Sequence, residues 1–280
     1  MKFYKYQALG NDYIVLNPDD FTVELTKEQI RRICHRNYGL GSDGILYGPI
    51  VAKDADFALR IFNPDGSKAE KSGNGLRIFS RYLWDTSKVG TKPFTISTPG
   101  GKVKAQVKQS GQIITVEMGR ASFDSTKIPV TGPPREVINE EMEIDGQLIK
   151  FSAVTIGNPH CVILKDKISE ALARKSGPKI ETDSRFPNRT NVQFMIVSDR
   201  ANIRIEIWER GAGYTLSSGS SSCAAAAVAR RLGICDSQIK VHMPGGQIDI
   251  TVSDDYSIIM TGSVTKIAEG TVSEEIFSRM

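Results

Sequence analysis

The chain has few of the residues that build metal centres and disulfide frameworks. Only four cysteines and three histidines occur in 280 residues, and no two cysteines form a Cys-x-x-Cys pair. A structural zinc site and a disulfide framework are therefore not expected. Acidic and basic residues nearly balance, giving a net charge of +4. That charge is too small and too evenly spread to indicate a nucleic-acid or membrane partner.

The sequence also lacks a long apolar run. No segment approaches the length of a membrane span, and the first residues, MKFYKY, contain no apolar signal-peptide core. These absences predict a soluble, cytoplasmic protein. The length exceeds that of one typical domain and is sufficient for two hydrophobic cores.

An internal repeat organises the chain. Four landmarks recur in the same order, about 145 residues apart. The matched pairs are Gly10-Asn11 with Gly157-Asn158, Arg60–Gly66 with Glu206–Gly211, Ser72-Gly73 with Ser218-Gly219, and Pro99–Gly101 with Pro244–Gly246. We therefore expect two domains, residues 1–118 and 119–264, with a final strand in 265–280 returning to the first.

Each copy has the same expected layout. Short β-rich runs lead to a Ser-Gly pair, a helix follows, and a Pro-Gly-Gly turn then opens two alternating strands. The helix around Ala224–Val228 is small and apolar on most faces, so it should be fully buried. Thr26 to Gln29 matches a capping box and predicts another helix start. The predicted fold is α+β, with mostly antiparallel strands forming a barrel around a central helix in each copy.

The two Ser-Gly helix starts suggest anion sites. A helix N-terminus carries unpaired N–H groups and a partial positive charge, which attract a carboxylate or phosphate. Ser72 and Ser218 are nucleophile-sized side chains at these positions, although serine is also a common N-cap. No Asp–His pairing with either serine is evident, so a serine-hydrolase triad is not indicated.

Polar residues recur beside the landmarks. Asparagines next to glycine or proline are typical of turns, but their repetition in both copies also fits a polar pocket. An arginine can hold a carboxylate bidentately, and a glutamate can hold an ammonium group. His160 is the one histidine within a matched landmark. The polar set comprises Asn11, Asn63, Asn74, Asn158, Asn191, Glu209 and Arg210.

The motifs together resemble the diaminopimelate epimerase family. They are Leu9–Tyr13, Arg60–Ser67, Ser72–Gly75, Gly157–Cys161, Trp208–Gly213, Pro244–Gly246 and Met260–Gly262. The resemblance spans nearly the whole chain. It implies two pseudo-symmetric domains, each a strand barrel around a central helix, with the active site in the cleft between them. It further implies a free amino acid as substrate, neither pyridoxal phosphate nor a metal as cofactor, and a homodimer.

The resemblance also implies residue roles. In the family, one cysteine thiolate removes the α-proton and a second thiol protonates the opposite face. Ser72 and Ser218 occupy those two positions here. The amides expected to hold the α-carboxylate are at Gly73, Asn74, Gly219 and Ser220. The rest of the substrate would contact Asn11, Asn63, Asn158, Asn191, Glu209 and Arg210. His160 and Glu209 would lie beside the two acid/base groups and tune them.

The serines depart from the family pattern. A thiol ordinarily titrates near ~8.5, whereas an alcohol lies several units higher and is a poor general base at neutral pH. The chain is either a double Cys→Ser substitution or a natural branch in which His160 or Glu209 assists the serines. Gly44 also stands where many members carry glutamine. Cys223 lies inside the buried helix and is expected to be a core thiol rather than a replacement base.

Three functions remain open from the sequence. The first is epimerisation of LL- to meso-diaminopimelate, in lysine and cell-wall synthesis, by two-base proton transfer. The second is racemisation of another amino acid, such as histidine. The third is a non-catalytic amino-acid-binding paralogue that keeps the pocket without turnover.

Overall fold

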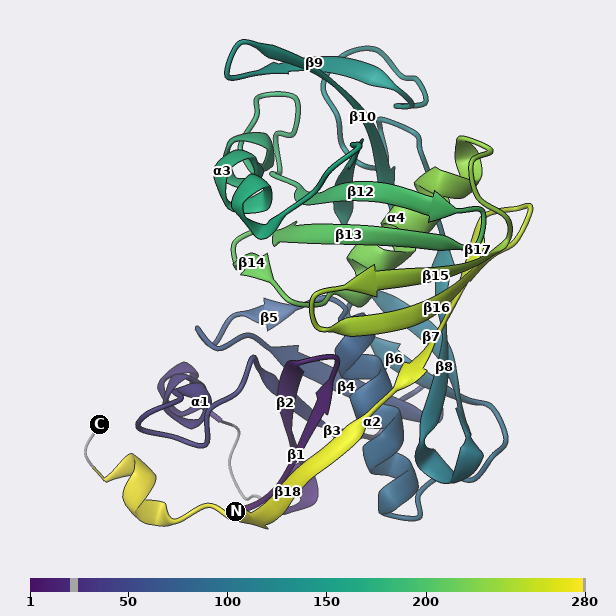
Figure 1. Cartoon of the computed structure of the whole chain (residues 1–280). Coiled ribbons are helices and arrows are strands. Elements are labelled where there is room, and N and C mark those ends of the chain that lie inside the picture. Colours follow the sequence, from purple (N-terminus) through teal and green to yellow (C-terminus); the bar gives the residue numbers. More distant parts are fainter. Residues whose placement is uncertain (21–24, 279–280) are drawn as a thin grey trace. The chain divides into compact units, whose positions relative to one another are not determined.

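The computed structural model describes residues 1–20 and 25–278. The chain divides into two compact units. Unit 1 contains Met1–Val116 and Gly262–Met280, and unit 2 contains Glu117–Thr261. In the described residues each unit combines a mixed β-sheet with two α-helices (Figure 1).

The sheet of unit 1 begins where the two ends of the chain pair. Strand β18 (Thr265–Thr271) lies antiparallel to β1 (Lys2–Ala8), as Figure 1 shows. The next strands in order are β2 (Asn11–Leu16), β3 (Ile45–Ile50), β4 (Phe57–Phe62), β6 (Phe94–Thr98), β7 (Gly101–Lys108) and β8 (Ile113–Arg120). The pairs β2/β3 and β4/β6 are parallel. A short strand, β5 (Lys68–Ala69), forms an antiparallel pair with β4.

Unit 2 repeats this pattern of pairing. Its strands in order are β9 (Glu140–Ile144), β10 (Gln147–Thr155), β11 (Pro159–Leu164), β12 (Asn191–Asp199), β13 (Asn202–Glu209), β15 (Gln238–Met243), β16 (Gly246–Val252) and β17 (Ser257–Ser263). The parallel pairs are β11/β12 and β13/β15, and the short β14 (Gly213–Thr215) pairs with β13. The predicted α+β fold with two repeated domains is confirmed.

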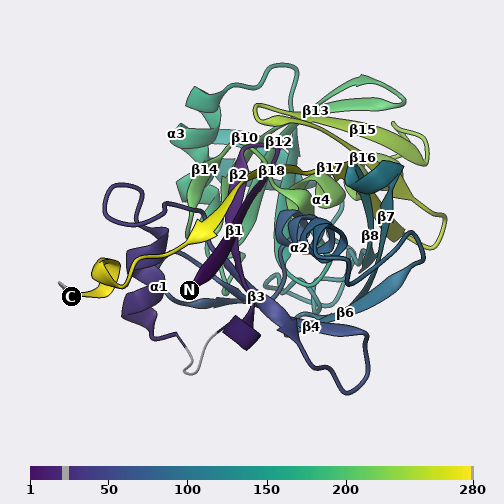
Figure 2. The same ribbon diagram turned by 90° about the horizontal axis from the view of Figure 1, so that it is seen from below.

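A central helix occupies the same place in each repeat. Helix α2 (Gly73–Asp85) contacts β1, β2 and β7, and Figure 2 shows it nearly end-on among the strands of unit 1. Helix α4 (Gly219–Arg231) contacts β10 to β13, β15 and β16. The alanines Ala224–Ala227 of α4 are 0% exposed, which confirms the predicted burial. Small side chains let the strands approach this helix closely, and little space remains for larger ones.

Two further α-helices pack outside the central ones. Helix α1 (Lys27–Cys34) begins at Thr26 with the predicted capping box. Helix α3 (Glu170–Glu181) was not predicted, because Gly177 and Pro178 both weaken a helical pattern. Gly177 is required by packing, since a Cβ there would lie 2.6 Å from Trp208 Cβ. The short 3-10 helices are Pro18–Asp20, Gln109–Gly111 and Glu274–Phe277.

Within the part of the chain that the structure describes, no helix has the length and apolar character of a membrane span.

The packing around α4 predicts a strong response to added volume. Ala226→Leu should lower the free energy of unfolding by about 1–3 kcal/mol, because a close-packed interior must shift to accept the larger side chain. The same change at the exposed Ala201 should cost less than about 0.5 kcal/mol. Chemical denaturation monitored by circular dichroism measures both. Equal effects at the two positions would contradict tight packing around α4.

Candidate active site

The start of α2, in unit 1, carries the first predicted acid/base position. Ser72 is the N-cap residue, and its Oγ accepts a hydrogen bond from the Gly75 backbone N–H at 3.0 Å. The hydroxyl of Tyr13 lies 3.2 Å from the same Oγ. Gly73 and Asn74 open the helix and are buried. First-turn amides have no intrahelical acceptor, so this helix start is suited to bind a carboxylate.

A chain of hydrogen bonds fixes the polar side chains beside this helix start. Asn74 Nδ2 donates to Asn11 Oδ1 at 3.1 Å, and Arg77 Nη2 donates to Asn74 Oδ1 at 2.7 Å. Asn11 Nδ2 donates to Asp43 Oδ2 at 2.9 Å. These hydrogen bonds place Asn11 and Asn74 beside the start of α2. There the two side chains join the loop that carries Asn11 to helix α2.

Charged residues anchor the loop that carries Asn11. Arg36 Nη2 lies 2.8 Å from Asp12 Oδ1 and 2.6 Å from Asp43 Oδ1, and Lys5 Nζ lies 3.1 Å from Asp12 Oδ2. Burial alone would raise the pKa of Asp12, but the hydrogen bonds from Arg36 and Lys5 outweigh it and lower that pKa. Asp12 is therefore a stable anion that ties β2 to its neighbours.

Asn63 occupies a tight turn between β4 and β5. Its Nδ2 donates to Ser67 Oγ at 2.9 Å, and its backbone carbonyl accepts from Gly66 N–H at 2.9 Å. Gly66 has φ +81°, so the turn depends on glycine. The structure thus places Asn63 as a turn residue, and its predicted contact with substrate stays a prediction.

The start of α4, in unit 2, carries the second predicted acid/base position. Ser218 is the N-cap residue and is 4% exposed. Its Oγ lies 3.4 Å from the Ser221 backbone nitrogen, which donates to it, and 3.4 Å from Ser220 Oγ. Gly219 is buried and Ser220 is half-buried. Both predicted acid/base positions therefore cap a central helix through the same hydroxyl geometry.

Asn191 connects two loops of unit 2. Its Nδ2 donates to the Pro159 carbonyl at 2.8 Å, and its Oδ1 accepts from the Arg210 N–H at 3.0 Å. Asn191 is 6% exposed, so it serves as an internal link. Through Asn191 the structure connects the Asn158-Pro159 segment to the Glu209-Arg210 turn, and so groups four members of the predicted polar set: Asn158, Asn191, Glu209 and Arg210.

His160 is fully buried beside Asn158. Its Nε2 lies 3.0 Å from Asn158 Oδ1. Burial lowers the pKa of His160 to about 3, although a hydrogen bond with Gln193 acts in the opposite direction. The ring is therefore neutral near pH 7 and is a weak base. It is suited to orient Asn158 rather than to take a full proton from a serine.

Glu181 was missed in the sequence and supports the same turn. This buried carboxylate accepts from Trp208 Nε1 at 2.6 Å and from Gly211 N–H at 2.8 Å, and it forms an ion pair with Arg189. Arg189 is exposed, and its guanidinium reaches inward to this buried carboxylate. The contact could not be read from the sequence, because Glu181 ends a helix that was itself not predicted.

Two other polar residues were also missed. Gln193 is fully buried and donates to Ser221 Oγ at 3.0 Å, beneath the start of α4. Its polar side chain within the apolar run 192–196 was a usable signal. Tyr13 was part of a quoted motif, but nothing in the spacing indicated its contact with Ser72.

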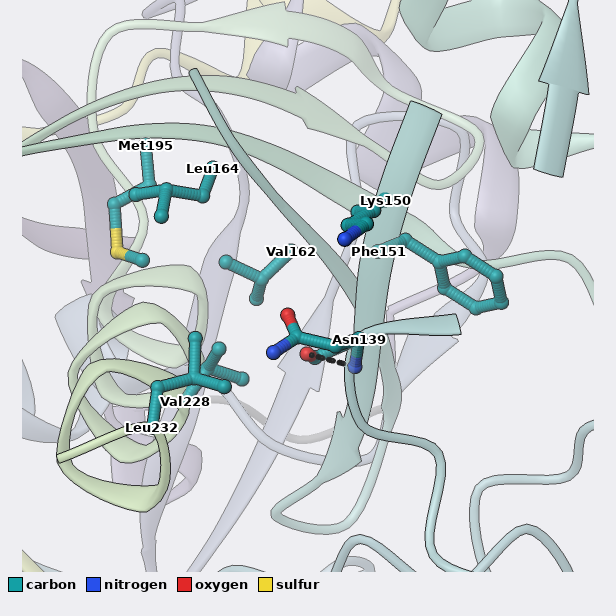
Figure 3. A pocket seen from close by; sticks show the side chains of 9 residues that line it. Asn139, Lys150, Phe151, Val162, Leu164, Met195, Val228 and Leu232 are labelled. Carbon is teal, nitrogen blue, oxygen red and sulfur yellow. Dashed lines mark hydrogen bonds between the residues drawn. The ribbon is translucent and has the colours of Figure 1, made fainter. Parts of the chain in front are cut away.

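The pocket shown in Figure 3 is separate from these residues. It encloses about 130 Å³ in unit 2. Its lining residues are Asn139, Lys150, Phe151, Ser152, Val162, Leu164, Met195, Val228 and Leu232. Val228 is ten residues beyond Ser218 on α4, about 15 Å along the helix. None of the predicted site residues lines this pocket.

Metal-ligating side chains are not clustered in the described residues. Across 1–20 and 25–278, no group of three or more His, Cys, Asp or Glu side chains is arranged to hold a metal ion.

Comparison with known proteins identifies the family. The sequence profile described as "Diaminopimelate epimerase" matches residues 3–124 and 152–267. The chain belongs to the diaminopimelate epimerase family. A relative from Nostoc sp. strain PCC 7120, named "Diaminopimelate epimerase 2", is 63% identical over 278 residues, covering 99% of this chain and 98% of the relative. A "Diaminopimelate epimerase" from Desulfitobacterium hafniense is 35% identical, covering 99% and 100%. The resemblance carried by the motifs is confirmed.

Solved structures share the fold of this epimerase family member. A probable proline racemase from Agrobacterium radiobacter K84 aligns with a TM-score of 0.73 at 15% identity, covering 100% of this chain and 94% of that one. A hydroxyproline epimerase from Agrobacterium vitis aligns with a TM-score of 0.69 at 14% identity, covering 97% and 90%. At these identities the likeness concerns the fold alone.

The contacts of Glu181 predict a large effect on stability. Glu181→Ala should lower the free energy of unfolding by about 3 kcal/mol, because it leaves the Trp208 and Gly211 donors without their acceptor. The exposed Glu170, which pairs with Arg174 one helical turn away, is the matched control. Glu170→Ala should cost less than about 0.5 kcal/mol. Urea denaturation would contradict this view of Glu181 if the two variants were equally stable.

Buried His160 predicts a loss of stability in mild acid. Its ring titrates near 6.5 when unfolded but at about 3 in the fold, so below pH 6.5 the unfolded chain binds a proton that the folded protein excludes. Between pH 7 and pH 5 the protein should lose about 2 kcal/mol more stability than the His160→Gln variant. Denaturation curves at both pH values measure the difference. Replacement of the exposed His35 by glutamine gives the background, and an equal loss in all three proteins would refute the prediction.

Proposed function

We propose that the chain is a cofactor-independent epimerase that interconverts LL- and meso-diaminopimelate. The observation that carries this proposal is the family match over nearly the whole chain, including a 63% identical relative named diaminopimelate epimerase 2. The acid/base positions remain the unusual feature, since both carry serine.

The two helix starts suit the substrate's reacting end. Removal of an α-proton places negative charge on the α-carbon and its carboxylate. Backbone amides at Gly73 and Asn74, and at Gly219 and Ser220, are donors that need no reorganisation as this charge develops. We assign carboxylate binding to these amides. The partial positive charge at each helix start adds to their effect.

The remaining polar residues suit the rest of a diamino dicarboxylate. Arg210 is exposed, and its Nη1 donates to the Asn188 carbonyl at 3.1 Å, which leaves other donors of the guanidinium for a carboxylate. Glu209 is the nearby anion, and we assign it to an ammonium group. Asn11, Asn63, Asn158 and Asn191 complete the proposed substrate-binding set.

Inversion at the α-carbon needs one group to take a proton and another to give one to the opposite face. We assign these roles to Ser72 and Ser218. An alcohol is a much weaker general base than a thiol at neutral pH, so turnover with serine should be slow. Slow turnover and intact binding are therefore the expected behaviour of the protein as it stands.

Hydrogen exchange at the α-carbon tests the proposed function. In deuterated water, LL-diaminopimelate should gain α-deuterium slowly with the unmodified protein. The double variant Ser72→Cys/Ser218→Cys should exchange at least about a hundredfold faster, because a thiol titrates close to working pH. Proton NMR of the α-hydrogen measures the rate. The control is cysteine at the exposed Ser87 and Ser237, which should change nothing.

Two results would overturn the proposal. Saturable diaminopimelate binding with no exchange, even in the double-cysteine variant, would indicate a non-catalytic binding protein. Exchange on another amino acid, such as histidine, but not on diaminopimelate would indicate a different racemase.

A further inference from the structure

Tyr13, Gly44 and Ser72 form one cluster beside the start of α2. Tyr13 lies on β2 and is 8% exposed, and its hydroxyl lies 3.2 Å from Ser72 Oγ. Gly44 immediately precedes β3, the parallel neighbour of β2, and its carbonyl accepts the Ile14 N–H at 3.1 Å. The phenol that contacts Ser72 is therefore held by a strand of the sheet rather than by a surface loop.

Gly44 makes room for the phenol ring. A Cβ at Gly44 would lie 2.7 Å from Tyr13 Cε1 and 2.5 Å from the Phe62 carbonyl oxygen. Both distances are below van der Waals contact, so any side chain at position 44 would displace the ring or the backbone. Gly44 and Ser72 are two positions at which the sequence departs from the family pattern. In the structure both touch the same tyrosine.

The hydrogen-bonding capacity of Ser72 leaves a place for this partner. A hydroxyl has one donor and two acceptor positions, and the Gly75 N–H uses one acceptor of Ser72 Oγ. If Tyr13 donates to Ser72, both acceptor positions of Ser72 Oγ are occupied, and the serine O–H can donate its proton to the substrate. If Tyr13 is the phenolate and Ser72 donates to it, the serine proton can pass to the phenolate while the remaining acceptor position on Ser72 Oγ takes a proton. The pair can therefore be set for either direction of transfer.

We propose that Tyr13 is the proton partner of Ser72 and that the two side chains act together as one acid/base unit; this inference rests on the proposed epimerase function. In the removal step the substrate Cα–H bond breaks and its proton goes to Ser72 Oγ. The original serine proton passes to the phenolate oxygen of Tyr13, and the electron pair stays on the substrate. In the return step Ser72 protonates the carbanion and takes the Tyr13 proton, which regenerates the phenolate.

A phenol replaces most of what the missing thiol would supply. Phenol ordinarily titrates near ~10 and a thiol near ~8.5, so the handicap is about thirtyfold in the proton-transfer equilibrium. A serine alone lies several units higher. At the other helix start, the contacts of Ser218 Oγ within residues 1–20 and 25–278 are the Ser220 hydroxyl and the Ser221 N–H, both at 3.4 Å, and neither is a phenol. The two acid/base positions are therefore unequal, and the phenol serves the Ser72 position alone.

The test uses Ser218→Cys as background, so that the rate reports on the Ser72 position. Conversion of LL- to meso-diaminopimelate, which needs both groups, is followed by chiral chromatography. Adding Tyr13→Phe should lower kcat at least tenfold with KM changed less than twofold, because the hydroxyl is lost and the ring remains. Adding Ser72→Cys to that variant should restore kcat, since a thiol does not need the phenol.

The matched control is Tyr6→Phe. Tyr6 faces Tyr13 across the β1/β2 pair, and its buried hydroxyl donates to Asp85 at 2.9 Å instead of reaching Ser72. This change should leave kcat unaltered. An unchanged kcat in Tyr13→Phe, a loss that Ser72→Cys does not rescue, or no conversion by Ser218→Cys alone would each overturn the phenol proposal. No conversion by the double-cysteine enzyme would instead overturn the proposed function itself.

Discussion

The structure depends on two serine hydroxyls that begin two buried helices. Each caps its helix by accepting a first-turn amide, Gly75 N–H for Ser72 and Ser221 N–H for Ser218. A buried helix start must satisfy its free amides or offer them to a ligand. The strands around α2 and α4 hold these ends in place. The hydroxyls that begin the helices are also those of the proposed acid/base positions, so under this proposal folding and chemistry depend on one set of hydrogen bonds.

Most of the fold could be predicted from the internal repeat, because landmarks that recur at a fixed spacing indicate that the same topology occurs twice. The capping box at Thr26 and the alanine-rich helix α4 followed from local patterns that packing reinforced. The repeat placed a boundary at residues 118/119, and the compact units meet at 116/117. Helix α3 escaped prediction because Pro178 contradicts its propensity, while tertiary packing against Trp208 and a Ser169 N-cap stabilise it.

The residues of the candidate site could be predicted from the sequence, but the contacts between them could not. Adjacent glycine and proline marked Asn11, Asn158 and their matches as special. Whether such an asparagine meets a ligand or a neighbouring loop depends on contacts between distant segments, and sequence spacing carries no information about these. Asn191 is an example, since both its side-chain groups bond protein backbone. Glu181 and Tyr13 were overlooked for the same reason: each acts through a residue far away in the chain.

The double attachment of Asn191 has a consequence for how this protein could change over evolution. One amide spans the segment that ends at Pro159 and the turn that carries Arg210. Neither loop can adopt a new conformation without abandoning a buried hydrogen bond that also orders the other. Substitutions that change the conformation of one loop alone therefore cost a buried hydrogen bond, and a new conformation requires substitutions in both loops. Unit 2 is therefore expected to diversify its two loops as a linked set, with position 191 the last to vary.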